Sequence, residues 1–486
     1  MIEEKNKDLL SSLSLIFLLC VVCLWWAKNT KGFHLDPMIY TAVSKNLSND
    51  HRYFNLTLSK TLFPVFREHP PFFFWIQSLI FDFFKILKIP LSGFIARLLP
   101  LLSSTGTVVS VFFIVFFLSD IKFATASSIL LLLSPQFLKY GTDPFIESFL
   151  TFLSSLTILT FILAEKKSPK WLLLTGLFSG FAAITKGPVF LFIPFTVLFY
   201  SICYRIDLKK FLPWILPSFV FFLIPLALWI IPDILINKGE WLLFFIKKQI
   251  IYSSAGRGIT RVNPFKYIYV LLIYHPHILI LSIVSLYTAI KNKKIPSFVT
   301  LGLIWSLSVI LPFSIMKWKL EHYIHPSYPA ISMVAGYSVS FLKEETFLKL
   351  RASLKRLVVI IISLLLILYP IKQEDRLKSF FPILTYLKGL KGTDFELSII
   401  RKKDPPWQET AFFKTWLDKD LIIYSNLESA TSNLKSEYKF IIINTEELKK
   451  EEKIIKKTKT TLILRSGDYS LLFIGDKDYL PYLNFD

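Results

Sequence analysis

The chain has 486 residues, of which 53% are hydrophobic, with a mean hydropathy of +0.52 and a formal net charge of +21. Hydropathy this high excludes an ordinary soluble globular protein. Nucleic-acid binding is disfavoured too, because many Lys and Arg residues lie in short clusters between apolar runs. The three cysteines (Cys20, Cys23 and Cys203) all lie inside apolar runs, so we interpret them as packing thiols.

Apolar stretches close to the roughly 20 residues needed to cross a bilayer recur through the first three quarters of the chain. The sequence therefore predicts an all-α polytopic membrane protein with about 11 transmembrane helices. The first is interpreted as a retained anchor, because no small-residue cleavage site follows it. The predicted spans cover about residues 9–27, 98–118, 123–139, 145–164, 171–203 (as two spans), 211–231, a stretch ending before Lys291, 297–316, 324–342 and 357–370.

Residues 72–87 are apolar but too short for a span, and Ser78, Asp82 and Lys85 recur there at helical spacing. A polar stripe on an apolar helix is typical of a helix that lies in the membrane surface. If this segment does not cross, the basic clusters fall on the cytoplasmic side, as the positive-inside rule requires. Two long loops, about 28–97 and 232–266, then lie outside the cytoplasm.

From about residue 371 the pattern changes to short strand-like runs between polar pieces: LIIYS, KFIIIN, TLILR and YSLLFIG. Asn444 can cap a helix that has Glu447 at its third position, and Ser466-Gly467-Asp468 predicts a hairpin turn. We therefore predict two domains, a transmembrane domain over residues 1–370 and a small extracytoplasmic α/β soluble domain over residues 371–486.

Ionisable residues at the edges of predicted spans gather on the extracytoplasmic side in this threading. Some also have a purely structural interpretation. Asp143 precedes Pro144 and can start a helix, Lys186 can snorkel from a Gly-Pro turn, and His69 can be a hydrogen-bonded loop histidine. The set comprises Asp36, Glu68, His69, Asp143, Lys186, Lys247, Lys248, Arg257, Arg261, Lys317, Lys319, Glu321 and His322.

This combination on one membrane face has a chemical interpretation. Carboxylates can deprotonate a hydroxyl or hold a metal ion, and cations can stabilise a departing phosphate or pyrophosphate. An apolar groove beside them can hold a lipid tail. Together they indicate a site that transfers a group from a lipid-linked phosphate to an acceptor outside the cytoplasm.

The order of the motifs resembles the C-type (GT-C) membrane glycosyltransferases, most closely the aminoarabinose transferase / protein O-mannosyltransferase group. The resemblance covers about residues 10–340. It implies a polyprenyl-phosphate-sugar donor, an extracytoplasmic active site and inversion at the anomeric carbon. The motifs that carry it are Asp36 to Tyr40, EHPPFFFWIQ, TDPFIESF, AAITKGPVFLFIPF and KWKLEHYIHPSYPA.

The resemblance also implies roles for the acidic motifs. Asp36 and Tyr40 match the first-loop motif, but Pro37 stands where the family has Glu. Asp36 then carries the general-base or metal-linked role by itself, and a divalent metal ion is left open as a cofactor. Asp143 matches the second acidic motif, whose family role is structural or acceptor-positioning.

The basic motifs match less evenly. His69 stands where the aminoarabinose branch has Lys, Lys186 matches the TKGP turn, and Lys319 and Tyr323 match a K-L-P-x-Y motif in which Glu321 replaces the proline. We therefore predict Asp36 and Asp143 as catalytic residues, His69, Lys186, Arg257, Arg261 and Lys319 as donor-phosphate ligands, Tyr40, Glu68, His322 and Tyr323 as substrate-positioning residues, and no assigned metal ligand.

The predicted function is an inverting glycosyltransferase of cell-envelope biogenesis in the inner (plasma) membrane. Its partners would be the polyprenyl-phosphate sugar donor, a lipid, glycan or protein acceptor, and membrane lipids, with no nucleic acid. One alternative is a transporter or flippase for a lipid-linked sugar, which would place ionisable residues at mid-bilayer, often in repeated halves. Another is a non-catalytic scaffold that binds a partner through its C-terminal domain.

Overall fold

The computed structural model describes residues 2–25, 31–252, 263–368, 377–390, 394–402, 404–432, 438–451, 455, 458 and 460–475. The chain forms two compact units. We call them the helical unit, made of Met1–Lys28, Arg67–Ile80 and Phe94–Lys372, and the mixed unit, made of Asn29–Phe66, Phe81–Gly93 and Gln373–Asp486. The mixed unit thus draws on early segments of the chain as well as on its C-terminal part.

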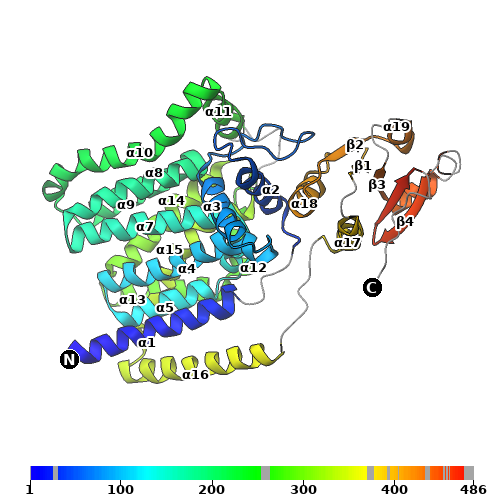
Figure 1. Cartoon of the computed structure of the whole chain (residues 1–486). Coiled ribbons are helices and arrows are strands. Elements are labelled where there is room, and N and C mark those ends of the chain that lie inside the picture. The colour runs from blue at the N-terminus through cyan, green and yellow to red at the C-terminus, as the bar shows by residue number, and fades with distance from the viewer. Residues whose placement is uncertain are drawn as a thin grey trace. The chain divides into compact units, whose positions relative to one another are not determined.

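The helical unit is built from long apolar helices (Figure 1), because a chain in lipid has to satisfy its backbone polar groups within each segment. Short 3₁₀ or π segments join several of them. The elements are α1 (Ile2–Cys20), η1 (Val21–Trp25), α4 (Gly93–Leu118), α5 (Ile121–Leu132), α6 (Pro135–Gly141), α7 (Ile146–Lys166), η2 (Pro169–Trp171), α8 (Leu172–Lys186), η3 (Gly187–Leu191), α9 (Phe192–Cys203), η4 (Leu208–Phe211), α10 (Leu212–Asn237), α11 (Glu240–Phe244), η5 (Phe245–Tyr252), α12 (Lys266–Tyr274), α13 (Pro276–Lys291), α14 (Ser297–Ile315), η6 (Glu321–Ser327), α15 (Tyr328–Gly336), η7 (Tyr337–Phe341) and α16 (Glu344–Leu368).

Within the described residues, six helices are long and apolar enough to cross a membrane, or up to eight if each of two bent pairs is one span. The bends, 67° between α5 and α6 and 99° between α12 and α13, fall at Pro135 and Pro276, which cannot continue the helical hydrogen bonding. The predicted all-α polytopic fold is confirmed, whereas the count of about 11 spans stays a prediction. The six are Asn6–Trp25, Gly93–Leu118, Ile146–Lys166, Pro169–Cys203, Lys209–Asn237 and Ser297–Ile315.

The structure differs from the predicted loops and spans in particular places. The segment predicted as a long loop over 232–266 is partly helical, because α10 continues to Asn237 and is followed by α11 and η5. The segment predicted as a span over 324–342 contains α15, which has only nine residues and lies between two 3₁₀ segments. The hydropathy of these stretches shows their apolar character but not where each helix ends.

Helices α7, α8 and α10 lie side by side, and α8 packs closely on α10 through glycines (Figure 1). A Cβ added to Gly176 would lie 2.0 Å from the Ser218 carbonyl oxygen, and one added to Gly180 would lie 2.4 Å from that of Phe222. Small residues four apart let membrane helices approach to backbone contact. This contact fixes α8, whose last residue is Lys186.

The mixed unit contains a five-stranded sheet in the order β2-β1-β3-β5-β4. Strand β1 pairs in parallel with β2 and β3, whereas β5 pairs antiparallel with β3 and β4. The four predicted strand runs correspond to β2–β5, and β1 was not predicted. The elements of the C-terminal part are η8 (Lys378–Phe380), α17 (Phe381–Gly389), β1 (Glu396–Ile400), α18 (Trp407–Leu417), β2 (Leu421–Tyr424), α19 (Leu427–Ser432), β3 (Lys439–Asn444), α20 (Thr445–Lys450), β4 (Thr460–Ser466) and β5 (Tyr469–Ile474).

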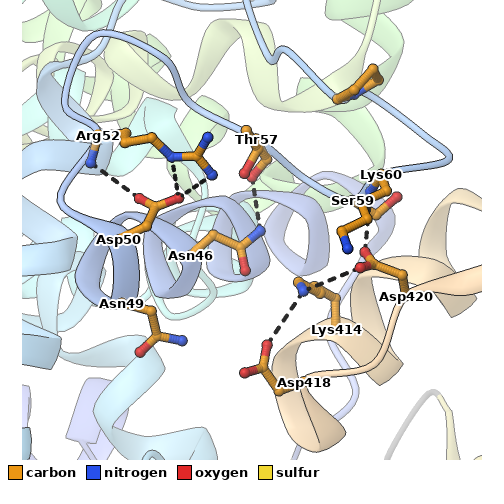
Figure 2. A pocket seen from close by; sticks show the side chains of 11 residues that line it. Asn46, Asn49, Asp50, Arg52, Thr57, Ser59, Lys60, Lys414, Asp418 and Asp420 are labelled. Carbon is orange, nitrogen blue, oxygen red and sulfur yellow. Dashed lines mark hydrogen bonds and ion pairs between the residues drawn. The ribbon is translucent and has the colours of Figure 1, made fainter. Parts of the chain in front are cut away.

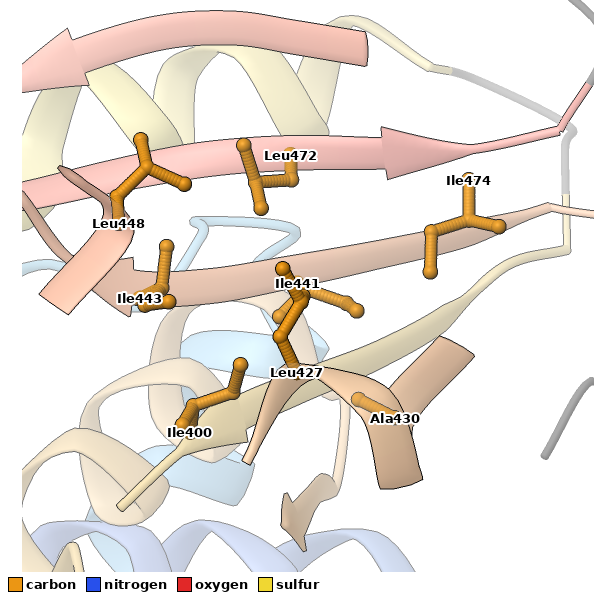
Figure 3. Close-up of a cluster of buried hydrophobic side chains, with 8 residues drawn as sticks. All are labelled: Ile400, Leu427, Ala430, Ile441, Ile443, Leu448, Leu472 and Ile474. Carbon is orange, nitrogen blue, oxygen red and sulfur yellow. The ribbon is translucent and has the colours of Figure 1, made fainter. Parts of the chain in front are cut away.

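Local sequence signals in this sheet are confirmed. Gly467 opens the β4–β5 turn with φ +55°, a value that glycine adopts without strain. The Asn444 side chain accepts a hydrogen bond from the Glu446 backbone N–H, 2.9 Å away, and so caps α20. One face of the sheet covers an apolar cluster drawn in Figure 3, which includes Ile400, Ile441 and Leu472.

The first loop contains a helix that the sequence did not predict, α2 (Leu35–Asp50), and this helix packs against α18 in the mixed unit. Side chains of α18 also bind the segment that precedes α2: Gln408 Nε2 donates to the Phe33 carbonyl oxygen at 2.7 Å, and Trp416 Nε1 donates to that of Lys31 at 3.1 Å. The beginning of the first loop, Asn29–Phe66, and the C-terminal sheet therefore belong to the same structural unit.

The predicted helix over 72–87 is present as α3 (Phe72–Ile86). Within the mixed unit, two residues of its polar stripe bond to α2: Asp82 Oδ1 accepts from Ser48 Oγ at 2.6 Å, and Lys85 Nζ donates to Asn49 Oδ1 at 3.3 Å. The stripe thus serves helix–helix packing. Its predicted place in the membrane surface stays a prediction.

Candidate active site

Three ionisable side chains from distant motifs meet in the interior of the helical unit. Glu147 comes from the first turn of α7, Lys186 is the last residue of α8, and His322 lies in η6. Lys186 Nζ donates a hydrogen bond to Glu147 Oε1, and His322 Nε2 lies 3.3 Å from the same oxygen. We call Glu147, Lys186 and His322 the buried cluster, because their side chains are only 4–11% exposed.

Backbone geometry explains why these groups face one another. Gly187 has φ +61° and ends α8 immediately after Lys186, and a Cβ there would lie 2.4 Å from the Phe245 ring. The contacts of Glu147 with Lys186 and His322 show that the start of α7, the end of α8 and the segment after α14 meet at one place in the helical unit. The Lys186 ammonium also lies 4.9 Å from the centre of the Tyr323 ring.

The buried cluster carries no net charge. Burial lowers the pKa of His322 to about 4, and the attraction of Glu147 offsets this only in part. His322 is therefore neutral at pH 7, and the remaining charges are one carboxylate and one ammonium. Such a pair is held in place by mutual attraction in a medium that screens charge weakly.

Glu321, where the family motif has proline, forms a second group beside the buried cluster. Its Oε2 accepts a hydrogen bond of 2.8 Å from Tyr140 Oη and lies 3.6 Å from Lys139 Nζ. Burial alone would raise the Glu321 pKa, but the hydrogen bond from Tyr140 and the charge of Lys139 lower it. Glu321 is thus an ionised carboxylate beside α6, the helix that contains Lys139 and Tyr140.

Lys319, predicted to bind donor phosphate, is nearly buried and donates a hydrogen bond to the Met316 carbonyl oxygen. Burial lowers its pKa, and the nearby charge of Lys266 lowers it further. Lys266 Nζ in turn donates to the Lys319 carbonyl oxygen at 2.6 Å. Two cations therefore lie together at the start of the 319–323 motif.

Asp143 makes an ion pair with Arg97 of α4, with 3.0 Å between Asp143 Oδ1 and Arg97 Nε. The Arg97 side chain is only 4% exposed. Helix α7 begins at Ile146 with Phe145 as its N-cap residue, so Asp143 lies outside its first turn. Its ion pair links α4 to the α6–α7 connection.

The REHPP stretch is tied to the segment after α10. Arg67 Nη1 lies 2.7 Å from Glu240 Oε2, and Lys248 Nζ lies 2.8 Å from Glu68 Oε1. The half-buried His69 accepts a hydrogen bond at its carbonyl oxygen from Trp241 Nε1, 3.1 Å away. Glu68 and His69 are therefore anchored to α11 and η5 rather than left in a loose loop.

The remaining predicted residues lie elsewhere. Asp36 is half-buried in the first turn of α2, and Tyr40 is buried one turn further on the same face of that helix. Both belong to the mixed unit. Arg257 and Arg261 lie outside the described residues.

The predicted residues Lys186, His322 and Tyr323 are thus brought together, whereas the partners Glu147, Arg97 and Tyr140 were not predicted. Glu147 had a usable signal, because an ionisable residue inside an apolar span indicates a functional site. Arg97 and Tyr140 lie in apolar runs, and their sequence neighbourhoods do not identify their partners.

A metal ion bound by the protein would need several ligand side chains close together. Across the described part of the chain, no group of three or more His, Cys, Asp and Glu side chains could hold a metal ion. The divalent metal ion that the sequence left open as a cofactor stays a prediction.

Comparison with known proteins identifies the fold. The family model for dolichyl-phosphate-mannose-protein mannosyltransferase matches residues 68–230, which include Glu68, Asp143 and Lys186. The crystal structure of ArnT from Cupriavidus metallidurans in the apo state matches with a TM-score of 0.72 and 15% identity, covering 96% of this chain and 98% of that one. The chain has the fold of ArnT.

Two further structures extend the comparison. ArnT bound to undecaprenyl phosphate matches with a TM-score of 0.70 and 13% identity, over 96% of this chain and 97% of that one. The archaeal oligosaccharyltransferase AglB from Archaeoglobus fulgidus, in complex with an inhibitory peptide and a dolichol-phosphate, matches with a TM-score of 0.54 and 12% identity, over 99% of this chain and 75% of that one. The resemblance drawn from the sequence motifs is therefore confirmed.

Curated relatives are more similar in sequence but are themselves uncharacterized. Two proteins of Aquifex aeolicus (strain VF5) are 30% and 28% identical over 275 and 294 residues, which are 56% and 58% of this chain. The matched part spans only 60% and 54% of their own lengths.

Proposed function

We propose that this integral membrane protein is an inverting glycosyltransferase that moves a sugar from a polyprenyl-phosphate-linked donor to an acceptor outside the cytoplasm. The observation that carries the proposal is the convergence of distant motifs on the buried cluster, at one end of α7 and α8, in a chain with the fold of ArnT. Glycosyl transfer from a lipid phosphate needs polar groups at the membrane boundary beside apolar helices, and this arrangement supplies them.

In the proposed reaction Asp36 takes the proton of an acceptor hydroxyl. The hydroxyl oxygen forms a bond to the anomeric carbon of the sugar, while the bond from that carbon to the phosphate oxygen breaks. Polyprenyl phosphate leaves with the bonding electrons, and the configuration at the anomeric carbon inverts. General-base assistance of this kind contributes about 100- to 10,000-fold to a rate.

The basic residues divide into two proposed roles. Lys319 and Lys266 are neighbouring cations that can stabilise the departing phosphate. His69, Arg257 and Arg261 stay proposed phosphate ligands. In this structure the positive charge of Lys186 is balanced by the carboxylate of Glu147. Lys186 therefore holds the site in shape more than it raises the electrostatic potential there. We therefore propose Lys186, with His322 and Tyr323, as a positioning residue beside the donor.

Several other assignments remain part of the proposal. Location in the inner membrane with an extracytoplasmic active site is supported by the positions of the basic clusters between spans. The similarity to ArnT bound to undecaprenyl phosphate supports a polyprenyl-phosphate donor. A role in cell-envelope or lipopolysaccharide glycosylation is part of the same proposal. Asp143 is proposed to hold the acceptor side of the site through its ion pair with Arg97.

A transporter or flippase is the competing function. Such proteins place coupled ionisable groups near the bilayer midplane, often between repeated halves. Here Glu147 lies in the first turn of α7, one residue after the start of the candidate span Ile146–Lys166, and Lys186 is bonded to it there. This position favours a catalytic site at the membrane boundary.

The test is glycosyl transfer by the purified full chain in liposomes, using a radiolabelled polyprenyl-phosphate sugar and an envelope extract as acceptor. We expect label in a new glycosidic product, and Asp36→Asn to lower the rate at least about 100-fold with membrane insertion unchanged. Asp207→Asn, which alters an exposed Asp that caps η4, is the matched control and should transfer normally.

Two outcomes would contradict this proposal. Full transfer by Asp36→Asn would remove Asp36 as the base. Movement of the labelled donor across the liposome membrane, without any new glycosidic bond, would identify a transporter.

A further inference from the structure

The mixed unit contains a polar cavity of about 390 Å³, formed between the C-terminal end of α2, the chain that follows it, and the end of α18 with the turn into β2 (Figure 2). All of its lining residues belong to the mixed unit. Neither the motifs nor the proposed reaction uses them. We call this cavity the polar pocket.

Charges in the polar pocket cancel. Its walls carry the carboxylates of Asp50, Asp418 and Asp420 and the cations of Arg52, Lys60 and Lys414. Most of these are paired with each other, as the dashed lines in Figure 2 show: Arg52 Nη2 lies 2.7 Å from Asp50 Oδ2, and Lys414 Nζ lies 3.4 Å from Asp418 Oδ1 and 3.6 Å from Asp420 Oδ2. A phosphate site would instead present an excess of cations.

Hydrogen-bonding groups of both kinds line the same walls. Asn46 is fixed in orientation because its Nδ2 donates to the Thr57 and Leu58 carbonyl oxygens at 2.9 and 2.8 Å. Its side-chain oxygen is an acceptor, and the Asn49 amide and the Ser59 hydroxyl add donors and acceptors. Pro64 is the single apolar residue among the described residues that line the pocket, so an acyl chain would find no apolar wall.

Helix α2 connects the polar pocket to the proposed base. Asp36 lies in its first turn, whereas Asn46 and Asp50 lie at its C-terminal end. At 1.5 Å per residue, the helix separates these positions by about 15 to 20 Å. A group bound in the pocket is therefore several sugar units away from a hydroxyl that reacts at Asp36.

We propose that the polar pocket binds the carbohydrate portion of the acceptor, at a distance from the hydroxyl that is glycosylated. A neutral oligosaccharide fits, because each sugar hydroxyl both donates and accepts hydrogen bonds and needs no net charge opposite it. The separation along α2 further requires an extended acceptor, namely a glycan or a glycolipid headgroup of several sugar units. This inference rests on the proposed function for the identity of the bound sugar as acceptor.

The first experiment measures binding by saturation-transfer-difference NMR, using the full chain in a zwitterionic detergent that carries no sugar. The probes are neutral hexose oligosaccharides, inorganic phosphate and a deacylated glycolipid headgroup. We expect the oligosaccharides to bind and inorganic phosphate not to displace them. Binding of the deacylated headgroup but not of free oligosaccharides would identify a glycolipid as the source of the bound carbohydrate.

Matched variants locate the binding. Arg52→Gln with Lys60→Gln removes two cationic donors from the exposed rim of the pocket, and we expect about tenfold weaker oligosaccharide binding. Lys449→Gln with Lys450→Gln removes two exposed cations from α20 of the same unit and should bind as the unaltered chain does. Equal weakening by both pairs, unchanged binding in the Arg52/Lys60 variant, or displacement by phosphate would overturn the proposal.

Transfer kinetics separate this inference from the proposed function. With saturating donor, the Arg52/Lys60 variant should raise the KM for the acceptor about tenfold and leave kcat unchanged. If the unaltered chain binds oligosaccharide at the pocket but transfers no sugar, the proposed function fails and the carbohydrate site stands. If it transfers sugar to a protein or to a non-carbohydrate lipid with no dependence on Arg52 and Lys60, the pocket proposal fails and the proposed function stands.

Discussion

The buried cluster and the polar pocket have similar chemistry but opposite surroundings. Both consist of carboxylates and cations whose charges cancel. In the buried cluster Glu147 and Lys186 are 4% and 10% exposed, whereas in the polar pocket Arg52 and Asp418 are 59% and 55% exposed. Burial, rather than residue type, therefore decides whether a set of charges mainly stabilises the fold or can bind a ligand.

The physical basis is the cost of removing charge from water. Losing one partner of a buried ion pair leaves an uncompensated charge and typically costs about 3–5 kcal/mol. An exposed pair contributes about 0–1 kcal/mol, because water and salt screen it. The buried cluster should therefore act mainly through stability and geometry, and the polar pocket mainly through binding.

The largest expected effect comes from breaking the buried pair. Lys186→Met leaves Glu147 without its cationic partner, and Glu147→Gln leaves Lys186 without its carboxylate, so each single change should lower the free energy of unfolding by about 3–5 kcal/mol. The double variant leaves neither charge and should cost clearly less than the sum of the single changes. Thermal unfolding in detergent measures all four forms of this cycle.

A matched control for that cycle is the exposed pair of Glu345 and Lys349 on α16, whose side chains are 77% and 75% exposed. Lys349→Met should change stability by less than about 0.5 kcal/mol. Similar losses in the buried and exposed pairs would show that burial does not distinguish them.

The next effect is a pH dependence at His322. Its folded pKa of about 4 lies below the ordinary value of 6.5, so the unfolded chain binds a proton there first as the pH falls. Stability contributed by neutral His322 is present above pH 6.5 and declines as the pH falls toward 4, with roughly 2 kcal/mol lost between pH 7 and pH 5. Glu147, Lys186, Glu321 and Lys139 are the charged groups that act on it.

His322→Gln cannot titrate in this range and serves as the reference for that measurement. Unfolding temperatures at pH 7 and pH 5 should differ less in the variant than in the unaltered chain. An identical difference in both would mean that His322 is not held neutral by the surrounding structure.

The smallest expected effect on stability is in the polar pocket. Lys414 is itself only 16% exposed, but its partners Asp418 and Asp420, 3.4 and 3.6 Å away, are 55% and 22% exposed, so water screens both carboxylates. Lys414→Gln should therefore lower the free energy of unfolding by only about 0.5 kcal/mol. Chemical denaturation measures it, and a loss above about 2 kcal/mol would place this pair with the buried cluster instead.

The sequence predicted features that depend on neighbouring residues. Apolar runs gave the membrane helices, Asn444 gave the cap of α20, and Gly467 gave the β4–β5 turn. It did not predict β1, in which the polar residues Glu396 and Ser398 interrupt the apolar run. It also missed α2, whose mixture of apolar and polar residues gives no span-length signal and whose stability comes from packing on α18.

The candidate site was predictable in part for the same reason. Lys186, His322 and Tyr323 could be selected as unusual polar residues at span ends, and the structure brings them together. Glu147, the common partner of Lys186 and His322, lies within one of the sequence motifs but was not selected. Its pairing with them depends on how α7 and α8 pack. Contacts between segments so far apart in the sequence follow from tertiary packing, which no single stretch specifies.

The packing of α2 on α18 has a consequence for how the chain is made. Ribosomes synthesise about 5–20 residues per second, so α18 emerges roughly 20–70 s after α2 has been completed. During that interval the helix carrying Asp36 has been released without the surface that buries it. A chain shortened before α18 would therefore keep the helices up to α16 but lack the surface on which α2 packs.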